Sequence, residues 1–179
     1  MTVAAFLDRD GVINFDHGYV SSWDQFDFMP GVPEALHGLA QAGYQLVIVS
    51  NQSGIGRGFY TEADLRKLNR QINDYLETAF DIQMAGFYHC PHHPTEARGA
   101  FLVQCECRKP APGMILQASQ DLGIDVSASL LVGDKDSDIQ AGRTAGVGRL
   151  FKVSPSSACD DGGSDVESIS ALPDVLSRL

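Results

Sequence analysis

The stretch VAAFLDRDG, residues 3–11, decides the fold. Its apolar part has the length of a buried strand, and two carboxylates, Asp8 and Asp10, follow it directly. In an extended chain residues i and i+2 face the same side, so both acids address one small volume before Gly11 lets the backbone turn. Two such acids repel, and a divalent cation relieves the repulsion. Taken alone, the stretch fits a metal site and an ordinary strand-ending turn about equally.

Outward from this stretch, strand patterns alternate with helix patterns. Further short strands are predicted near 45–49, 84–88, 130–132 and 149–153. Helices are predicted over 33–42, 61–80, 112–122, 136–145 and 171–178. The glycine-rich segment 51–58 and the Ser/Asp/Gly-rich segment 154–165 are expected to be loops, the second of them mobile. The alternation predicts an α/β domain whose mainly parallel sheet is flanked by helices, with ligands bound beyond the carboxyl ends of the strands.

Length and composition limit the classes of protein that need to be considered. The 179 residues, 44% hydrophobic and 20% charged, are expected to form one globular domain, 1–179. Lys and Arg number 13 against 23 Asp and Glu, and the net charge of −10 disfavours nucleic-acid binding. No apolar run approaches the ~18 residues of a membrane span, and Met1–Leu7 does not resemble a signal peptide. We therefore expect a cytoplasmic protein with no membrane partner, and a monomer, since no helix pattern shows an obvious exposed apolar face.

Polar residues occur at the ends of other predicted strands. Ser50 follows the strand at 45–49, and GDKDSD, residues 133–138, follows the strand at 130–132. Its carboxylates Asp134 and Asp138 are oxygen ligands of the kind that Mg²⁺ prefers. Lys109, just before a predicted helix, adds a positive charge. A lone lysine is usually a solvated surface charge. Here the order of the motifs along the chain favours a single site that contains Lys109 together with the aspartates and Ser50.

With these motifs, the chain resembles the haloacid dehalogenase (HAD) superfamily of phosphohydrolases. The resemblance covers roughly residues 3–152 and rests on DRDGV (8–12), Ser50, Lys109 and GDKDSD. It departs at Val12, where many members have Thr, with little functional consequence expected. The resemblance implies a single Rossmann-like domain and a Mg²⁺-dependent phosphoric monoester hydrolase.

The resemblance also implies a role for each matching residue. Asp8 is expected to attack phosphorus and become an aspartyl phosphate, and Asp10 to act as general acid and base. Ser50 and Lys109 are expected to stabilise the phosphoryl group. Mg²⁺ is expected to be held by the Asp8 carboxylate, the Asp10 backbone carbonyl and Asp134.

A Cys/His segment over about 89–108 carries a second pattern. Cys90-Pro91-His92 and Cys105-Glu106-Cys107 are two pairs of i, i+2 ligands separated by twelve residues. Three sulfurs and one nitrogen, Cys90, His92, Cys105 and Cys107, predict a closed, structural Zn²⁺ site. His89 and His93 are competing nitrogen donors, and buried thiols beside a chance histidine are the alternative. Cys159 is expected to be a free thiol.

The zinc segment narrows the resemblance. With DHGYV (16–20), SNQSGIGRG (50–58), CPHHP (90–94) and CECRKP (105–110), the chain is similar to phosphatases of this superfamily that act on a heptose 1,7-bisphosphate. Those enzymes remove the 7-phosphate on the route to nucleotide-activated heptose for bacterial surface polysaccharide. Histidinol-phosphate phosphatases have a similar zinc loop and are the main alternative. A non-catalytic, zinc-stapled binding module is the other.

The intervals between the motifs leave no room for a separate cap domain. We therefore expect loops to wall the site, stiffened by the zinc segment. Arg108 suits a sugar or its distal phosphate because the guanidinium matches phosphate oxygens. By resemblance, the substrate-binding residues are Asp16, His17, Gly18, Tyr19, Asn51, Gln52, Ser53, Arg108 and Lys109.

Overall fold

The computed structural model describes residues 2–154 and 165–179. Its centre is a six-stranded sheet in the order β3-β2-β1-β4-β5-β6, and every neighbouring pair of strands is parallel. The strands are β1 (Val3–Leu7), β2 (Tyr44–Asn51), β3 (Gly86–Cys90), β4 (Leu130–Gly133), β5 (Arg149–Val153) and β6 (Val166–Ile169). The predicted α/β fold with a parallel sheet is confirmed.

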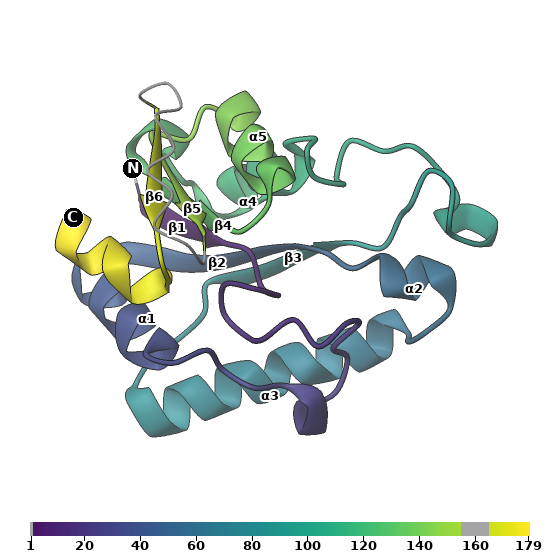
Figure 1. Cartoon of the computed structure of the whole chain (residues 1–179), viewed down its shortest axis with the longest axis horizontal. Helices are drawn as coiled ribbons and strands as arrows, with labels where there is room; N and C mark the ends of the chain where they lie inside the picture. Colours follow the sequence, from purple (N-terminus) through teal and green to yellow (C-terminus); the bar gives the residue numbers. More distant parts are fainter. Residues whose placement is uncertain (1, 155–164) are drawn as a thin grey trace.

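Helices cover both faces of the sheet (Figure 1). One face carries α1 (Val32–Gln41), α3 (Glu62–Phe80) and the C-terminal 3-10 helix η4 (Leu172–Arg178). The other carries α4 (Gly113–Leu122) and α5 (Asp136–Ala145). The remaining short helices are η1 (Trp23–Gln25), α2 (Ser53–Arg57), η2 (Gly99–Phe101) and η3 (Val126–Ala128).

The strand β1 is buried on both sides, which explains its continuous apolar sequence. Ala5 and Leu7 belong to the core cluster under α1 and α3, whereas Ala4 and Phe6 belong to the cluster under α4 and α5. This period of two is the geometry of a strand, and it distributes one short run between two cores. Polar residues begin only where β1 leaves the sheet, at Asp8.

The position of β1 also determines where ligands can bind. It lies between β2 and β4, so the strand order reverses there, and loops leave the carboxyl ends of β1 and β4 in opposite directions. Such a switch point opens a crevice beyond the strand ends. Asp8 follows β1 and Asp134 follows β4, so both carboxylates lie at this crevice.

Several predicted elements differ from the structure. The segment 51–58, predicted as a loop, contains the helix α2. The strand predicted at 84–88 lies two residues later, the C-terminal helix is a 3-10 helix, and the edge strand β6 was not predicted. Apart from Ser154 and Asp165, the predicted mobile loop 154–165 lies outside the described residues, as does Cys159.

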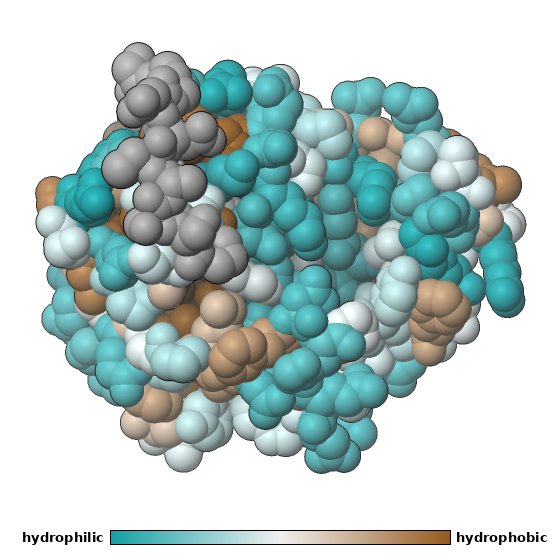
Figure 2. Space-filling model, in the orientation of Figure 1, coloured by the Kyte–Doolittle hydropathy of each residue, from teal (hydrophilic) through white to brown (hydrophobic). Residues whose placement is uncertain are grey.

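The surface in Figure 2 is mostly hydrophilic, and its apolar side chains lie in scattered patches on this face. Within the described residues, the helices are too short or too polar to cross a lipid bilayer.

Helix α3 begins with a capping box. The Thr61 side chain accepts a hydrogen bond from the Asp64 backbone N–H (3.1 Å), and the Asp64 carboxylate accepts one from the Thr61 N–H (2.8 Å). These bonds satisfy N–H groups that have no partner inside a helix. Donation to the Asp64 carboxylate from the Thr61 N–H, and also from the Thr61 hydroxyl at 2.7 Å, lowers the pKa of Asp64.

We expect Thr61→Ala to lower the free energy of unfolding by about 1 kcal/mol, because the N-cap acceptor is lost. Urea denaturation followed by circular dichroism measures this change. Thr61→Ser retains the hydroxyl and is the matched control. An alanine variant as stable as the serine variant would contradict the capping argument.

Candidate active site and zinc site

A buried lysine joins two carboxylates at the carboxyl edge of the sheet. Lys109 Nζ lies 2.7 Å from Asp8 Oδ1 and 2.7 Å from Asp138 Oδ1, and it donates to the Val49 carbonyl at 2.8 Å. The residue is only 4% exposed. Burial lowers the pKa of a lysine, but the two carboxylates outweigh burial and raise the pKa of Lys109. Lys109 is therefore a permanent cation inside the site.

The carboxylates outnumber the cation that pairs with them. Ligand oxygens of Asp8, Asp134 and Asp138 lie within 4.8 Å of one another, against a single buried ammonium. Burial is the main cause that raises the pKa of Asp8, to about 7, and Lys109 opposes the rise. Burial likewise raises the pKa of Asp134, opposed by Lys135. The site thus carries an excess of negative charge that a divalent cation would neutralise.

The hydrogen bonds distinguish which of these carboxylates suit a metal. Both oxygens of Asp138 are engaged, one by Lys109 and the other by the backbone N–H of Lys135 at 3.0 Å. Asp134 Oδ1 is buried without a hydrogen-bond partner. A buried oxygen of that kind is costly unless a ligand or water meets it. Asp8 and Asp134 therefore fit Mg²⁺, whereas Asp138 fits the role of orienting Lys109.

Asp10 is held by three side chains from two segments, the one that follows β1 and the one that follows β2. Arg9 Nη2 lies 2.9 and 3.0 Å from its two oxygens, Asn14 Nδ2 donates to Oδ1 at 3.0 Å, and Gln52 Nε2 donates to Oδ2 at 3.2 Å. The Asp10 side chain is 18% exposed, in contrast to the buried Asp8 beside it. One carboxylate is thus enclosed with a lysine, while the other is fixed but open to solvent.

Arg9 was not singled out by the sequence analysis. It is 1% exposed, and its Nη2 also donates to the Val20 carbonyl at 2.6 Å. Fully buried arginines are rare unless paired. Its position between two predicted catalytic acids was the only signal in the sequence, and the contact with Val20 depends on the tertiary fold.

The predicted residues at the end of β2 and directly after it make hydrogen bonds inside the protein. Asn51 donates to the Lys109 carbonyl at 3.1 Å and accepts from the Lys109 N–H at 3.0 Å, so its amide clamps that backbone. Gln52 Nε2 donates to Ser50 Oγ at 2.7 Å, and Gln52 Oε1 accepts from the Tyr60 hydroxyl. Tyr60 was not predicted as a site residue.

The predicted loop 16–19 lies on the surface. His17 Nε2 is 2.8 Å from Asp27 Oδ2, and Asp16 Oδ2 is 4.0 Å from Lys135 Nζ. Tyr19 has a positive φ of 53° and packs edge-on against Phe59. Ser53 begins α2, and Arg108 Nη1 donates to the His92 carbonyl at 3.3 Å.

The four predicted zinc ligands form one cluster. Cys107 Sγ lies 2.8 Å from Cys90 Sγ and 3.3 Å from both Cys105 Sγ and His92 Nδ1. Cys90 Sγ is 3.5 Å from Cys105 Sγ and 3.6 Å from His92 Nδ1. Three thiolates and an imidazole in this arrangement suit Zn²⁺.

The competing histidines have other partners. His89 Nε2 lies 3.0 Å from Glu62 Oε1, and His93 Nδ1 accepts from the backbone N–H of Glu96 at 3.0 Å. The cluster also lies close to the catalytic edge, because Cys107 precedes Lys109 by two residues. A zinc ion there would fix the backbone from which Lys109 extends.

We expect zinc removal to lower the free energy of unfolding by about 2–5 kcal/mol, as loss of a comparable covalent cross-link does. The segment 91–107 should lose protection from hydrogen exchange, whereas β1 and β2 should keep theirs. Cys105→Ser should act in the same direction, and Cys159→Ser is the matched control. Unchanged stability in a protein shown by elemental analysis to be zinc-free would contradict this expectation.

Fold and site together define a class of enzyme. Residues 106–151 match the family model described as HAD-hydrolase-like. The parallel sheet, the acidic strand ends and this match make the protein a hydrolase of the haloacid dehalogenase class, as the resemblance implied.

Known relatives narrow the class to a family. The chain is 42% identical to the D-glycero-beta-D-manno-heptose-1,7-bisphosphate 7-phosphatase of Pasteurella multocida over 100% of this chain and 99% of that protein. It is 49% identical to the protein of the same name from Escherichia coli K12, over 84% and 78%. The chain belongs to the D-glycero-beta-D-manno-heptose-1,7-bisphosphate 7-phosphatase family.

Solved structures agree with this assignment. The D,D-heptose 1,7-bisphosphate phosphatase from B. bronchiseptica, complexed with magnesium and phosphate, superposes with a TM-score of 0.84 at 29% identity, covering 99% of this chain and 97% of that one. The corresponding enzyme from Burkholderia thailandensis gives a TM-score of 0.69 at 25% identity, with the same coverage.

Proposed function

We propose that the protein hydrolyses the C7 phosphate of D-glycero-β-D-manno-heptose 1,7-bisphosphate and releases heptose 1-phosphate, in the synthesis of nucleotide-activated heptose. The observation that carries this proposal is the buried Asp8–Lys109–Asp138 contact at the strand ends, next to the unpartnered oxygen of Asp134. Its occurrence in a chain 42% identical over its full length to a phosphatase of that name supports the substrate.

Asp8 is the nucleophile in this proposal. The strand β1 holds it at the switch point of the sheet, and Lys109 contacts the Oδ1 atom at 2.7 Å. Attack of a carboxylate oxygen on phosphorus forms an aspartyl phosphate and expels the sugar alkoxide. Lys109 and the Ser50 hydroxyl meet the phosphoryl oxygens, and their fixed positions supply charge stabilisation without reorganisation.

Asp10 is the general acid and then the general base. Its carboxyl group is partly exposed, so it can reach both the departing sugar oxygen and the incoming water. Protonation of the alkoxide completes the first step. Removal of a proton from water in the second step lets hydroxide release phosphate from Asp8.

Asp8, Asp134 and the backbone carbonyl of Asp10 would hold Mg²⁺. When bound, this ion supplies positive charge between the anionic nucleophile and the anionic phosphate. The excess of carboxylates over buried cations supports this ligand set. Zn²⁺ is proposed for Cys90, His92, Cys105 and Cys107, in a structural role.

Substrate recognition is proposed for loops that surround the edge of the sheet. Arg108 and the surface residues of 16–19 are open to a sugar or its second phosphate, and Ser53 lies at the start of α2. Asn51 and Gln52 are engaged internally, and we assign them to holding Lys109, Ser50 and Asp10 in place.

We further propose that 1–179 is one structural unit, monomeric and cytoplasmic. The proposed zinc site needs Cys90, Cys105 and Cys107 in reduced form, which supports a reducing compartment, where disulfides do not replace a zinc site. Light scattering of the purified protein tests the monomer, since a dimer would double the measured mass.

The test of the function is phosphate release from a panel of esters with Mg²⁺ present. We expect the highest kcat/KM for the heptose 1,7-bisphosphate, with phosphate lost from C7. A preference for histidinol phosphate would replace the proposal by its main alternative. No release from any ester would favour a zinc-stapled binding module.

A further inference from the structure

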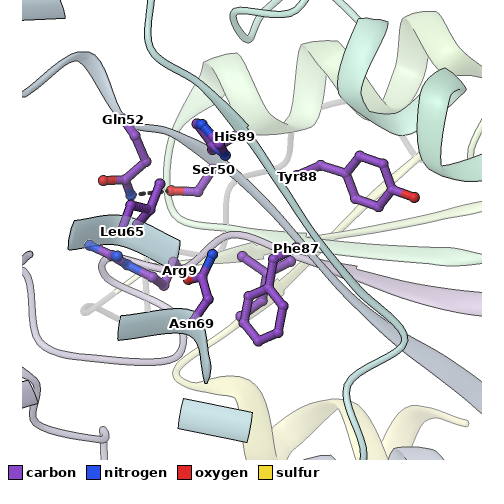
Figure 3. A pocket seen from close by; sticks show the side chains of 9 residues that line it. Arg9, Ser50, Gln52, Leu65, Asn69, Phe87, Tyr88 and His89 are labelled. Atoms are coloured by element: carbon purple, nitrogen blue, oxygen red, sulfur yellow. Dashed lines mark hydrogen bonds between the residues drawn. The ribbon is translucent and has the colours of Figure 1, made fainter. Parts of the chain in front are cut away.

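A buried glutamine connects two groups of the proposed reaction. Gln52 is 3% exposed, and its Nε2 donates both to Ser50 Oγ (2.7 Å) and to Asp10 Oδ2 (3.2 Å). Figure 3 shows the amide nitrogen directed at the Ser50 hydroxyl. The orientation of a single amide thus affects a phosphoryl-binding hydroxyl and the general acid together.

The Tyr60 hydroxyl contacts the other end of this amide, donating to Gln52 Oε1. Burial is the main cause that raises the pKa of Tyr60, to about 12, so the phenol keeps its proton. If the amide turned over, its oxygen would face the Asp10 carboxylate, and two acceptors would oppose each other. Donation from Tyr60 to Oε1 favours the orientation in which nitrogen faces Asp10.

The ring of Tyr60 is itself held in place. It packs with Ile55 and Leu65, and a Cβ atom at Gly54 would lie 2.2 Å from its Cε1 atom. Because glycine has no side chain, residue 54 leaves room for the Tyr60 ring. A small cavity lined by Gln52 and Ser50 has a volume of only about 10 Å³, enough for about one water molecule.

We propose that Tyr60 is a positioning residue of the phosphatase, which fixes the Gln52 amide so that its nitrogen faces Asp10 and Ser50. The inference rests on the proposed function, because Asp10 and Ser50 matter only if the site transfers phosphate. Tyr60 touches neither group itself and acts through Gln52.

The first test is Tyr60→Phe, which removes one oxygen and keeps the ring. We expect kcat for the preferred ester to fall about tenfold, the effect of one buried hydrogen bond, with KM changed less than twofold. Tyr88→Phe is the matched control, because its hydroxyl binds Asp121 on the surface, and it should retain wild-type kcat. A Tyr60→Phe enzyme with wild-type kcat overturns the inference.

The second test separates positioning from general structural support. Gln52→Met removes both the donor and the acceptor, so we expect kcat to fall at least as far as in Tyr60→Phe. Adding Tyr60→Phe to Gln52→Met should then change kcat less than twofold, because the hydroxyl has no amide to orient. Equal losses in both backgrounds overturn the inference. If the Tyr60→Phe variant does not fold, the Gln52→Met variant is the test, and a wild-type kcat in Gln52→Met would overturn the inference. An inactive wild type would instead overturn the proposed function.

Discussion

Replacing Asp8 by Asn is expected to abolish phosphate release, with a loss of about 10⁴- to 10⁶-fold in kcat, as for other nucleophile removals. The amide is isosteric but cannot attack phosphorus. Single-turnover phosphate release at saturating Mg²⁺ measures the loss. Asp136→Asn is the matched control: this carboxylate lies at the same edge of the sheet but is exposed and binds Lys152. It should retain most of the wild-type activity.

The Asp8→Asn variant should remain folded and should keep its zinc. Burial raises the pKa of Asp8 to about 7, so without Mg²⁺ the folded state favours the protonated acid. An acid with a raised folded pKa costs stability as pH rises from its unfolded pKa, about 3.9, through the folded value. Asparagine removes that cost. Relative to wild type, the metal-free variant should therefore become more stable between pH 4 and 7, as thermal unfolding would show.

Two outcomes would contradict this account. Substantial turnover by Asp8→Asn would exclude Asp8 as the nucleophile. A beryllium fluoride adduct found on another residue, or absent from the wild type with Mg²⁺, would exclude an aspartyl phosphate at Asp8.

Local patterns were enough to predict the central elements. The helix α5 and the strand β5 have the predicted bounds, because a periodic apolar pattern and flanking turn residues determine them within the segment. The strand β6 could not be found this way. Its four residues, VESI, have little apolar pattern, and their extended conformation depends on pairing with β5.

The helix α2 was missed for a similar reason. Its sequence SGIGR contains two glycines, which disfavour helix in isolation. In the structure, a Cβ atom at Gly56 would lie 2.4 Å from the carbonyl oxygen of Pro91, so the helix packs against the start of the zinc segment. Tertiary packing that the sequence pattern does not show overrides the local propensity.

In the candidate site, too, local spacing predicted some contacts, whereas others depend on the tertiary fold. Ligands two residues apart, such as Cys105 and Cys107, could be paired from spacing alone, and the structure brings them together. Contacts such as Arg9 with Val20 and Tyr60 with Gln52 join segments whose approach depends on the loops. Spacing therefore predicted the residues of the proposed chemistry but missed the side chains that orient them.

Lys109→Met is expected to impair both folding and catalysis. The wild-type ammonium lies 2.7 Å from Asp8 and from Asp138, and all three side chains are buried. Removing one partner of a buried ion pair leaves uncompensated charge, which costs about 3–5 kcal/mol. Loss of a phosphoryl-stabilising cation should lower kcat by a further factor of about 10²–10³.

The destabilisation should depend on pH in a defined direction. Without Lys109, the folded-state pKa of Asp8 lies higher, because this cation opposes the effect of burial. Both proteins lose stability equally between the unfolded pKa, about 3.9, and the wild-type folded value of about 7, so the deficit relative to wild type should grow only as pH rises above about 7, where Asp8 ionises in the folded wild type but not yet in the variant. Urea denaturation of metal-free protein at several pH values measures this dependence.

Mg²⁺ provides the decisive comparison for Lys109→Met. A divalent cation at Asp8 and Asp134 would replace part of the missing positive charge, so Mg²⁺ should raise the melting temperature of the variant more than that of the wild type. Lys67→Met is the matched control, since this lysine is exposed on the helix α3. Its stability should stay within about 0.5 kcal/mol of wild type. Equal, pH-independent losses in the two lysine variants would mean that Lys109 contributes packing rather than charge.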